Sequence, residues 1–252
     1  MKAIPSVRVI NLTAAYGPTV ILKDVSFEVA TGEVFVVLGG SGCGKSTLLK
    51  QMIGLVPPAA GEIFIEGESL DKSAGPERLA VLRKFGVMFQ SGALFGSMTL
   101  SENVELALEE FTKLPRDARR EIAAMKLELV GLEDALHKLP SEVSGGMQKR
   151  AAIARAMAMD PGLLFLDEPS AGLDPVTSAD LDALILRLRD NVGVTFVVVT
   201  HELASIYAIA DRAIMLDKST KGIIAEGAPS ELRDHSDNPL VRAFFQRKPQ
   251  TS

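Results

Sequence analysis

Three short apolar runs stand out along the chain: VFVVL at Val34–Leu38, LLFL at Leu163–Leu166 and FVVV at Phe196–Val199. Each run is continuous rather than alternating, and each is too short for a helix. Such runs are typical of strands buried on both faces, as in a parallel sheet covered by helices. The pattern therefore predicts an α/β fold.

A polar or glycine-rich segment follows each of these runs. The segments are Gly39–Gly42, Asp167–Pro169 and Thr200–Glu202. Open α/β sheets bind their ligands at the carboxyl ends of the strands. Because all three segments would meet at that edge, they predict one shared site.

The N-terminal part of the chain predicts a second, antiparallel sheet. Val7–Leu12 and Ile21–Val29 have the character of strands and are joined through the turn signal Tyr16–Pro18. A further strand pair is expected around Glu62–Glu66, because glycines lie at both ends of this segment.

Helix formers replace the β-branched runs between about residues 91 and 160. Within this stretch, Arg116–Val130 puts Ile122, Met125 and Leu129 on one face and charged residues elsewhere, which predicts an amphipathic helix. We expect a helical subdomain that is inserted into the α/β core.

Composition limits the possible functions. The chain has 252 residues, 47% of them hydrophobic, and a net charge of −5, which argues against general nucleic-acid binding. The single cysteine, Cys43, excludes an intramolecular disulfide framework and fits a reducing compartment. No apolar run approaches the roughly 18 residues of a membrane span, and the N-terminus MKAIPSVRV lacks a secretory signal. We therefore expect a cytoplasmic protein.

The segment GGSGCGKS, residues 39–46, fits the phosphate-loop pattern G-x-x-x-x-G-K-[ST] and lies between a predicted strand and a predicted helix. In such a loop the backbone N–H groups turn toward a phosphate at the helix start. Lys45 would reach the β- and γ-phosphates, and the Ser46 hydroxyl would bind Mg²⁺. A chance glycine-rich turn is the alternative, and the order of strand, loop and helix speaks against it.

Two acids follow the second apolar run. Asp167 suits the coordination of Mg²⁺, and Glu168 suits the polarisation of an attacking water, which implies hydrolysis. His201 follows the third run, where it could contact a γ-phosphate, although a structural histidine is the general expectation at a strand end. We expect His137 and His235 to be surface residues.

An ordered set of motifs extends over nearly the whole chain. The phosphate loop, Gln90, SGG before a helix, LLFLDE, SAGLD and TH-E resemble the nucleotide-binding subunit of ATP-binding-cassette (ABC) transporters. The resemblance implies an ATPase with a P-loop NTPase (RecA-like) core and a mostly parallel sheet. It also implies an antiparallel β subdomain and a helical subdomain at about residues 91–160, all within one domain over residues 1–252.

The resemblance also assigns site residues. It implies that Glu168, His201 and Gln90 are catalytic and that Ser46, Gln90 and Asp167 bind Mg²⁺. It places ATP between two copies of the chain. One copy contributes the residues Tyr16, Gly39, Gly40, Ser41, Gly42, Cys43, Gly44, Lys45, Ser46 and Thr47, and the other contributes Ser144, Gly145 and Gly146. For Tyr16, packing on the core is the alternative to stacking on adenine. An alkylating reagent at Cys43 should block nucleotide entry.

The segment VSGGM at Val143–Met147 resembles the signature motif of this family. In that family the signature caps the γ-phosphate held by a second copy, so the resemblance implies a head-to-tail dimer closed by ATP. Met147 replaces the usual glutamine, either by neutral drift at a position that faces away from phosphate or as a functional choice. Asp174 in SAGLD would lie at the dimer contact.

Three segments point to a transporter type. FQSGALFGSMTLSENV, MKLELVGL and SGGMQKRAAIARA resemble the ATPases of bacterial lipid-trafficking systems that work with mammalian-cell-entry-domain (MCE) proteins. The resemblance implies phospholipid or other hydrophobic cargo, a membrane-spanning permease partner, a possible MCE-domain partner, no nucleic acid, and a peripheral position on the cytoplasmic side of the bacterial inner membrane. A small-solute importer ATPase and a soluble ATP-dependent switch are the alternatives. The tail at Asn238–Phe245 either packs on its own core or helps to hold two ATPases together.

Overall fold

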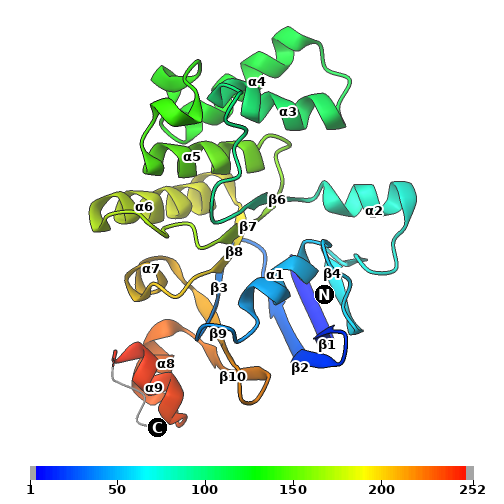
Figure 1. The fold of residues 1–252 in the computed structure, drawn as a ribbon, viewed down its shortest axis with the longest axis vertical. Coiled ribbons are helices and arrows are strands. Elements are labelled where there is room, and N and C mark those ends of the chain that lie inside the picture. The colour runs from blue at the N-terminus through cyan, green and yellow to red at the C-terminus, as the bar shows by residue number, and fades with distance from the viewer. Residues whose placement is uncertain (1–3, 248–252) are drawn as a thin grey trace.

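Two β-sheets organise residues 4–247, the part of the chain that the computed structural model describes (Figure 1). The larger sheet has the strand order β10-β9-β3-β8-β7-β6, and the smaller one β2-β1-β4-β5. The strands are β1 (Val7–Tyr16), β2 (Thr19–Val29), β3 (Val34–Gly39), β4 (Ala60–Ile65), β5 (Glu68–Ser69), β6 (Phe85–Met88), β7 (Leu163–Asp167), β8 (Thr195–Val199), β9 (Arg212–Asp217) and β10 (Gly222–Gly227). The start of the MKAIPSVRV segment and the last five residues of the predicted domain lie outside the described residues.

The described part of the chain also contains helices. They are α1 (Lys45–Met52), α2 (Gly75–Leu82), α3 (Leu100–Phe111), α4 (Arg116–Leu129), α5 (Gly145–Ala156), α6 (Pro175–Val192), α7 (Leu203–Ile209), α8 (Pro229–His235) and α9 (Pro239–Phe245), with short 3₁₀ turns at Glu133–Ala135 and Pro140–Glu142. Of these helices, α3 and α4 pack against each other and against α5. Within residues 4–247, no helix has both the length and the apolar character that a membrane span requires.

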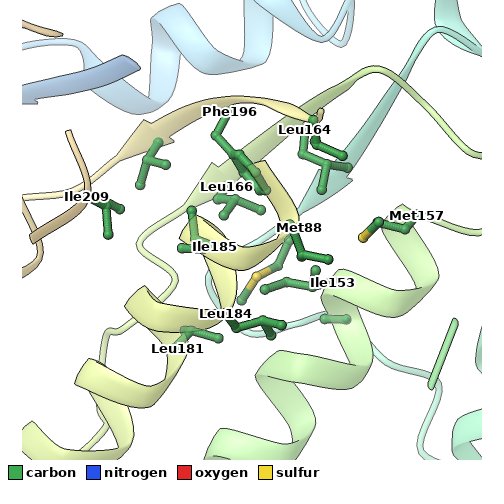
Figure 2. Close-up of a cluster of buried hydrophobic side chains, with 14 of the residues drawn as sticks. Met88, Ile153, Met157, Leu164, Leu166, Leu181, Leu184, Ile185, Phe196 and Ile209 are labelled. Carbon is green, nitrogen blue, oxygen red and sulfur yellow. The ribbon is translucent and has the colours of Figure 1, made fainter. Parts of the chain in front are cut away.

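The three apolar runs form the centre of the larger sheet, and the predicted α/β fold with a parallel core is confirmed. β3, β7 and β8 pair in parallel and are buried almost throughout. Their side chains alternate between two cores because successive residues of a strand point to opposite faces. Phe196 and Val198 join the core that includes α5 and α6, whereas Val197 and Val199 join the core that includes α1 and the smaller sheet. Figure 2 shows the first of these cores.

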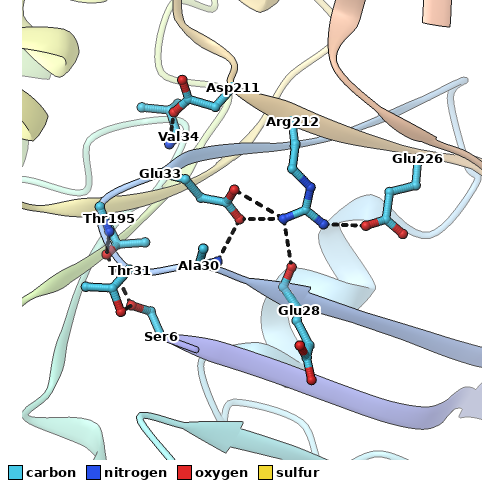
Figure 3. Close-up of polar contacts among 11 residues, drawn as sticks. Ser6, Glu28, Ala30, Thr31, Glu33, Val34, Thr195, Asp211, Arg212 and Glu226 are labelled. Atoms are coloured by element: carbon cyan, nitrogen blue, oxygen red, sulfur yellow. Dashed lines mark hydrogen bonds and ion pairs between the residues drawn. The ribbon is translucent and has the colours of Figure 1, made fainter. Parts of the chain in front are cut away.

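The predicted antiparallel sheet is also confirmed. β1 and β2 pair from Val7 opposite Val29 to Tyr16 opposite Thr19, around the tight turn that was expected. An arginine of β9 ties this sheet to the larger one (Figure 3): Arg212 binds Glu33 at 2.9 Å, binds Glu226, and contacts the carbonyl oxygen of Glu28 at 3.4 Å. The two sheets therefore share a polar connection as well as a core.

The predicted helix at Arg116–Val130 is present as α4, but the predicted apolar face is buried only in part, at Ile122. Met125 is 64% exposed and Leu129 is exposed, whereas Ala123 and Leu127 are fully buried. The reason is that α4 packs against α3 and α5 through its face with the small alanine, which allows close approach. Residues 91–160, which contain α3, α4 and α5, remain the predicted extent of a helical subdomain.

Candidate active site

The loop between β3 and α1 needs its glycines. Gly39, Gly42 and Gly44 have φ values of 148°, 75° and 106°, which side chains other than hydrogen rarely allow. A Cβ on Gly39 would also lie 2.4 Å from the carbonyl oxygen of Leu216. The loop can therefore turn closely around an anion at the start of α1, where free N–H groups and the helix dipole favour negative charge.

Lys45 is the first residue of α1, and its ammonium lies across this loop. Its Nζ donates to the carbonyl oxygens of Gly39 at 2.8 Å and Gly40 at 3.2 Å. The loop residues around it are open to solvent: Ser41, Gly42 and Ser46 are exposed, and Thr47 is half-buried. An incoming phosphate would offer the ammonium charged oxygens in place of neutral carbonyls.

Cys43 differs from its neighbours in this loop. Its side chain is only 2% exposed and belongs to the core under α1, and burial raises the pKa of its thiol. Both features slow alkylation, because the thiolate is the reactive form. Alkylation of Cys43 should therefore be slow, and the block of nucleotide entry by an alkylating reagent stays a prediction. Any contact of Cys43 with phosphate would come from its backbone.

Glu168 and His201 meet at the carboxyl ends of β7 and β8. The Oε1 atom of Glu168 lies 2.8 Å from Nδ1 of His201. Glu168 has a left-handed backbone, φ 46°, and its N–H donates to the carbonyl oxygen of Val199 at 2.8 Å. The backbone of two strands thus fixes this side chain.

The second carboxylate oxygen of Glu168 has no hydrogen-bond partner within residues 4–247, although it is buried. A buried acceptor without a donor is uncommon and marks a place for a water or a cation. His201 is 62% exposed, so this edge of the site is open to a substrate. The two remaining histidines, His137 and His235, are exposed as predicted.

Asp167 precedes Glu168 and faces a pocket of about 530 Å³ that Gln90 also lines. Burial raises the pKa of the Asp167 carboxyl and the neighbouring Glu168 raises it further, while Lys50, Lys45 and Lys149 act in the opposite direction. A cation bound beside this carboxyl group would stabilise its ionised form. Carboxylate, amide and hydroxyl oxygens suit Mg²⁺, which also takes phosphate oxygens as ligands, so Asp167, Gln90 and Ser46 fit that ion.

Ser144, Gly145 and Gly146 start helix α5. The Ser144 hydroxyl accepts from the N–H of Met147 at 3.3 Å and so caps the helix. In the described part of the chain, no hydrogen bond joins these three residues to the phosphate loop of the same copy. Met147 is half-buried against the core, which favours the interpretation that its side chain faces away from phosphate.

Gly146 packs against the first turn of α6, which follows the SAGLD segment, and Gly145 lies near Leu173 of that segment. A Cβ on Gly146 would lie 2.4 Å from the methyl group of Thr177. Asp174 caps α6 by accepting from the N–H groups of Val176 at 3.0 Å and Thr177 at 3.1 Å. The signature and SAGLD segments of one copy are therefore neighbours.

Tyr16 ends β1, and 49% of its surface is exposed. No hydrogen bond or ring contact found among residues 4–247 joins it to the phosphate loop. An exposed ring at a turn agrees with stacking on a base better than with packing on the core. Its role remains a prediction.

Lys149 is a residue that the sequence reasoning missed. It is only 8% exposed, lies on α5, and its Nζ donates to the carbonyl oxygen of Gln90. Gly146, Lys149 and Ile153 recur at helical spacing on the buried face of α5. A lysine on an otherwise small and apolar face was the signal that could have found it.

Comparison with known families places this geometry among transport ATPases. The family model described as "ABC transporter" matches residues 22–171. The chain is 41% identical over 240 residues to the probable ribonucleotide transport ATP-binding protein mkl of Mycobacterium leprae, covering 95% of this chain and 68% of that protein. It is also 41% identical over 229 residues to the intermembrane phospholipid transport system ATP-binding protein MlaF of Escherichia coli (strain K12), covering 91% and 84%. The mycobacterial relatives are thus longer, and the chain spans about two thirds of their length.

Solved structures give the same result. The chain aligns with cbiO1 from Clostridium perfringens, part of the cbiONQ ABC transporter complex, with a TM-score of 0.84 and 29% identity over 92% of this chain and 91% of that one. It aligns with a dimeric ATP-binding cassette in a post-hydrolysis state bound to ADP and Pi, with a TM-score of 0.79 and 32% identity over 88% and 98%.

Proposed function

The chain belongs to the ABC transporter family as one of its ATP-hydrolysing cassettes, and we propose that two copies of it close around ATP to power a membrane transporter. The observation that supports this most directly is the contact between Glu168 and His201 beside the phosphate loop. That pair joins a proton acceptor to a group that can hold it in place. Pure nucleotide binding would need neither residue.

The chemistry assigned to the chain's own residues follows from their contacts. Lys45 leaves the carbonyl oxygens of Gly39 and Gly40 and binds the phosphates of the substrate. The unpartnered oxygen of Glu168 accepts a proton from the attacking water, while His201 holds the other oxygen. The exposed edge of His201 is free to contact the terminal phosphate.

Mg²⁺ would be held by Ser46, Gln90 and Asp167 and would neutralise charge on the transferred phosphate. Of these three, Asp167 and Gln90 line one pocket, and Ser46 lies exposed in the first turn of α1. The raised pKa of the Asp167 carboxyl adds to the fit, because a bound cation favours the ionised form.

The second copy is needed because Ser144–Gly146 lack a contact with the phosphate loop of their own chain among the described residues. Ser144 and Gly145 are exposed at the start of a 12-residue helix, where an anion of another copy can be bound. A solved relative with 32% identity is dimeric with ADP and Pi bound. These observations support a head-to-tail dimer.

A groove of about 430 Å³ supports a membrane-spanning permease as the further partner. It lies between α2, α3 and α5 and is lined by the partly exposed side chains of Leu79, Phe95 and Phe111 and by Arg155. Phe95 belongs to the segment that follows Gln90, and Arg155 binds the carbonyl oxygen of Gly92 in the same segment. A cytoplasmic helix of a permease in this groove would therefore contact a segment that begins at Gln90. The ATPase would then lie peripherally on the cytoplasmic face of the bacterial inner membrane.

For the cargo we propose phospholipid or another hydrophobic molecule, handled with an MCE-domain protein. The support is the 41% identity to a phospholipid transport ATPase that is covered over 84% of its length. The ribonucleotide name of the mycobacterial relatives keeps a polar cargo as the second candidate.

The test is to purify tagged Glu168→Gln protein from native membranes in mild detergent and to identify the proteins and lipids that come with it. We expect a multispanning permease, an MCE-domain protein and phospholipid. A permease with a periplasmic solute-binding protein would contradict the lipid cargo, and recovery of no membrane protein would favour a soluble switch. Phe95→Glu should lose the permease, whereas Met125→Glu, at an exposed site outside the groove, should retain it.

A further inference from the structure

The segment Gln90–Thr99, here named the Gln90 loop, connects β6 to α3. Two basic side chains of α5 bind its backbone. Lys149 donates to the carbonyl oxygen of Gln90, and Arg155 donates to those of Gly92 at 2.8 Å and Ala93 at 2.6 Å. One helix thus holds three of the first four residues of the loop through cations.

Asn103 of α3 holds the rest of the Gln90 loop. Its side chain is fully buried, accepts from the N–H of Phe95 at 2.8 Å, and donates to the carbonyl oxygens of Phe95, Met98 and Thr99 at 2.9 to 3.1 Å. Every one of these bonds joins the loop to a helix of the segment at residues 91–160. The loop is therefore a part of the helical body.

The Gln90 loop makes fewer hydrogen bonds with the nucleotide-binding sheet than with the helices. Among the described strands, β6 lies at the edge of the sheet and pairs with β7 alone. In the range from residue 4 to 247, no hydrogen bond joins the Gln90 loop to β7, α1 or the phosphate loop. When the helical body rotates relative to the sheet, we expect the chain to bend before Gln90 and not after it.

Lys149 occupies the point where this body meets the site. The side chain is buried, and burial lowers the pKa of its ammonium while the carboxylates of Asp167 and Glu168 favour the charged form. The same helix starts with Ser144, five residues earlier, whose segment faces a second copy in the proposed dimer. A buried cation on a carbonyl makes a charge-assisted bond, and in the described residues Lys149 is the α5 side chain that binds Gln90 itself.

We propose that Lys149 is a positioning residue that makes the Gln90 loop and the signature segment Ser144–Gly146 move as one body. Through it, the arrangement of Gln90 at one ATP site sets the position of the signature at the other. This inference rests on the proposed function, because it needs an ATP-closed dimer.

The first experiment measures ATP binding and turnover separately in Lys149→Met, Lys149→Arg and Arg150→Gln. Lys149→Met should lower kcat at least about 10-fold and change the Kd of the monomer for ATP by less than about 3-fold, because the phosphate loop is untouched. Lys149→Arg should recover most of kcat, since a guanidinium can bind the same carbonyl. Arg150→Gln is the matched control: Arg150 is the next residue on α5, but it binds the carbonyl oxygens of Val130 and Gly131, away from the loop.

The second experiment separates failure of this inference from failure of the proposed function. Glu168→Gln protein is mixed with ATP, and dimer formation is followed by size-exclusion chromatography with light scattering. Glu168→Gln alone should dimerise, and if it does not, the proposed function is contradicted. If it dimerises and Glu168→Gln/Lys149→Met dimerises equally well, only the inference about Lys149 is overturned.

A readout without turnover guards against a general loss of fold. Amide hydrogen exchange of residues 90–95 should speed up at least about 10-fold in Lys149→Met and remain unchanged in Arg150→Gln, because exchange follows local opening. Equal exchange in the two variants would overturn the proposed attachment of the loop.

Discussion

The phosphate-loop region and the signature region are built by different means. In the phosphate-loop region, backbone contacts set the geometry: Gly39 faces the carbonyl oxygen of Leu216, and the N–H of Glu168 binds the end of β8. In the signature region, side chains do so: Gly146 faces the methyl group of Thr177, and Lys149 holds Gln90. One region is fixed by the sheet and the other by contacts that a single substitution can change.

This difference separates two tasks. The sheet can hold a reacting group in one position, because its backbone cannot shift without breaking the strand pairing. Side-chain contacts can break and re-form during a rotation of helices, as closure of a dimer requires. We therefore expect chemistry to depend on the first region and movement on the second.

The largest effect is expected at the chemistry itself. Glu168→Gln should lower ATP turnover by at least about 100-fold, the usual contribution of a general base, while ATP binding changes by less than about 3-fold. The amide can still contact His201, so the fold should be unchanged. Turnover is measured by phosphate release and binding by equilibrium dialysis. Wild-type turnover in this variant would contradict the assignment of Glu168 as the base.

A substitution in the phosphate-loop region should not be compensated by a second substitution, because it meets backbone atoms. Gly39→Ala forces a side chain onto a φ of 148° and against a backbone oxygen at 2.4 Å, so the free energy of unfolding should fall by about 2 to 3 kcal/mol. ATP binding should also be lost. Chemical denaturation gives the first value and dialysis the second. A stable variant that still binds ATP would contradict the claim that backbone contacts set the geometry of the phosphate-loop region.

A similar substitution in the signature region should be correctable. Gly146→Ala meets only the Thr177 methyl group, so we expect a loss of about 1 to 2 kcal/mol in unfolding free energy. Gly146→Ala/Thr177→Ser removes that methyl group, keeps a hydroxyl for Asp174, and should recover the stability to within about 0.5 kcal/mol. Chemical denaturation of the single and double variants gives the interaction energy. If the double variant is no better than Gly146→Ala, side chains do not set this region.

The smallest effect is expected at Asp182 of α6, the helix that Asp174 caps. Burial raises the pKa of this carboxyl from 3.8 to about 6. The folded state thus binds more protons than the unfolded state, so stability falls as pH rises from about 4 to 6 and stays lower above that range. Asp182→Asn should gain about 1 kcal/mol at pH 7.5, only part of the roughly 3 kcal/mol that two pKa units allow, because the amide is still a buried polar group.

The gain of Asp182→Asn should be much smaller at pH 4, because the folded wild-type protein is then almost uncharged at this position. ATP turnover should be unaffected in either case. Denaturation curves at pH 4 and pH 7.5 provide the measurement, and an equal gain at both values would rule out titration as its cause.

Sequence reasoning worked where burial is uniform. The runs at Val34–Leu38 and Phe196–Val199 became central strands because every residue in them is apolar and both sheet faces are covered. The pairing of Glu168 with His201 could be anticipated for the same reason, since each follows such a strand.

Sequence reasoning failed where packing between helices decides. On α4 the buried Ala123 is less hydrophobic than the exposed Met125, and only the neighbouring helices determine which of them is covered. Lys149 was missed because a charged residue is expected at the surface, although a carbonyl within reach makes its burial possible. Both cases depend on partners that are distant along the chain.

The buried thiol of Cys43 has a practical consequence. Because it is shielded and its pKa is raised, maleimide dyes should react with cysteines introduced at the surface much faster than with the native one. A dye pair on α4 and α9 could then be attached to the chain without removing its own cysteine. Fluorescence energy transfer would follow the rotation of the helical segment in single molecules that retain an unaltered phosphate loop.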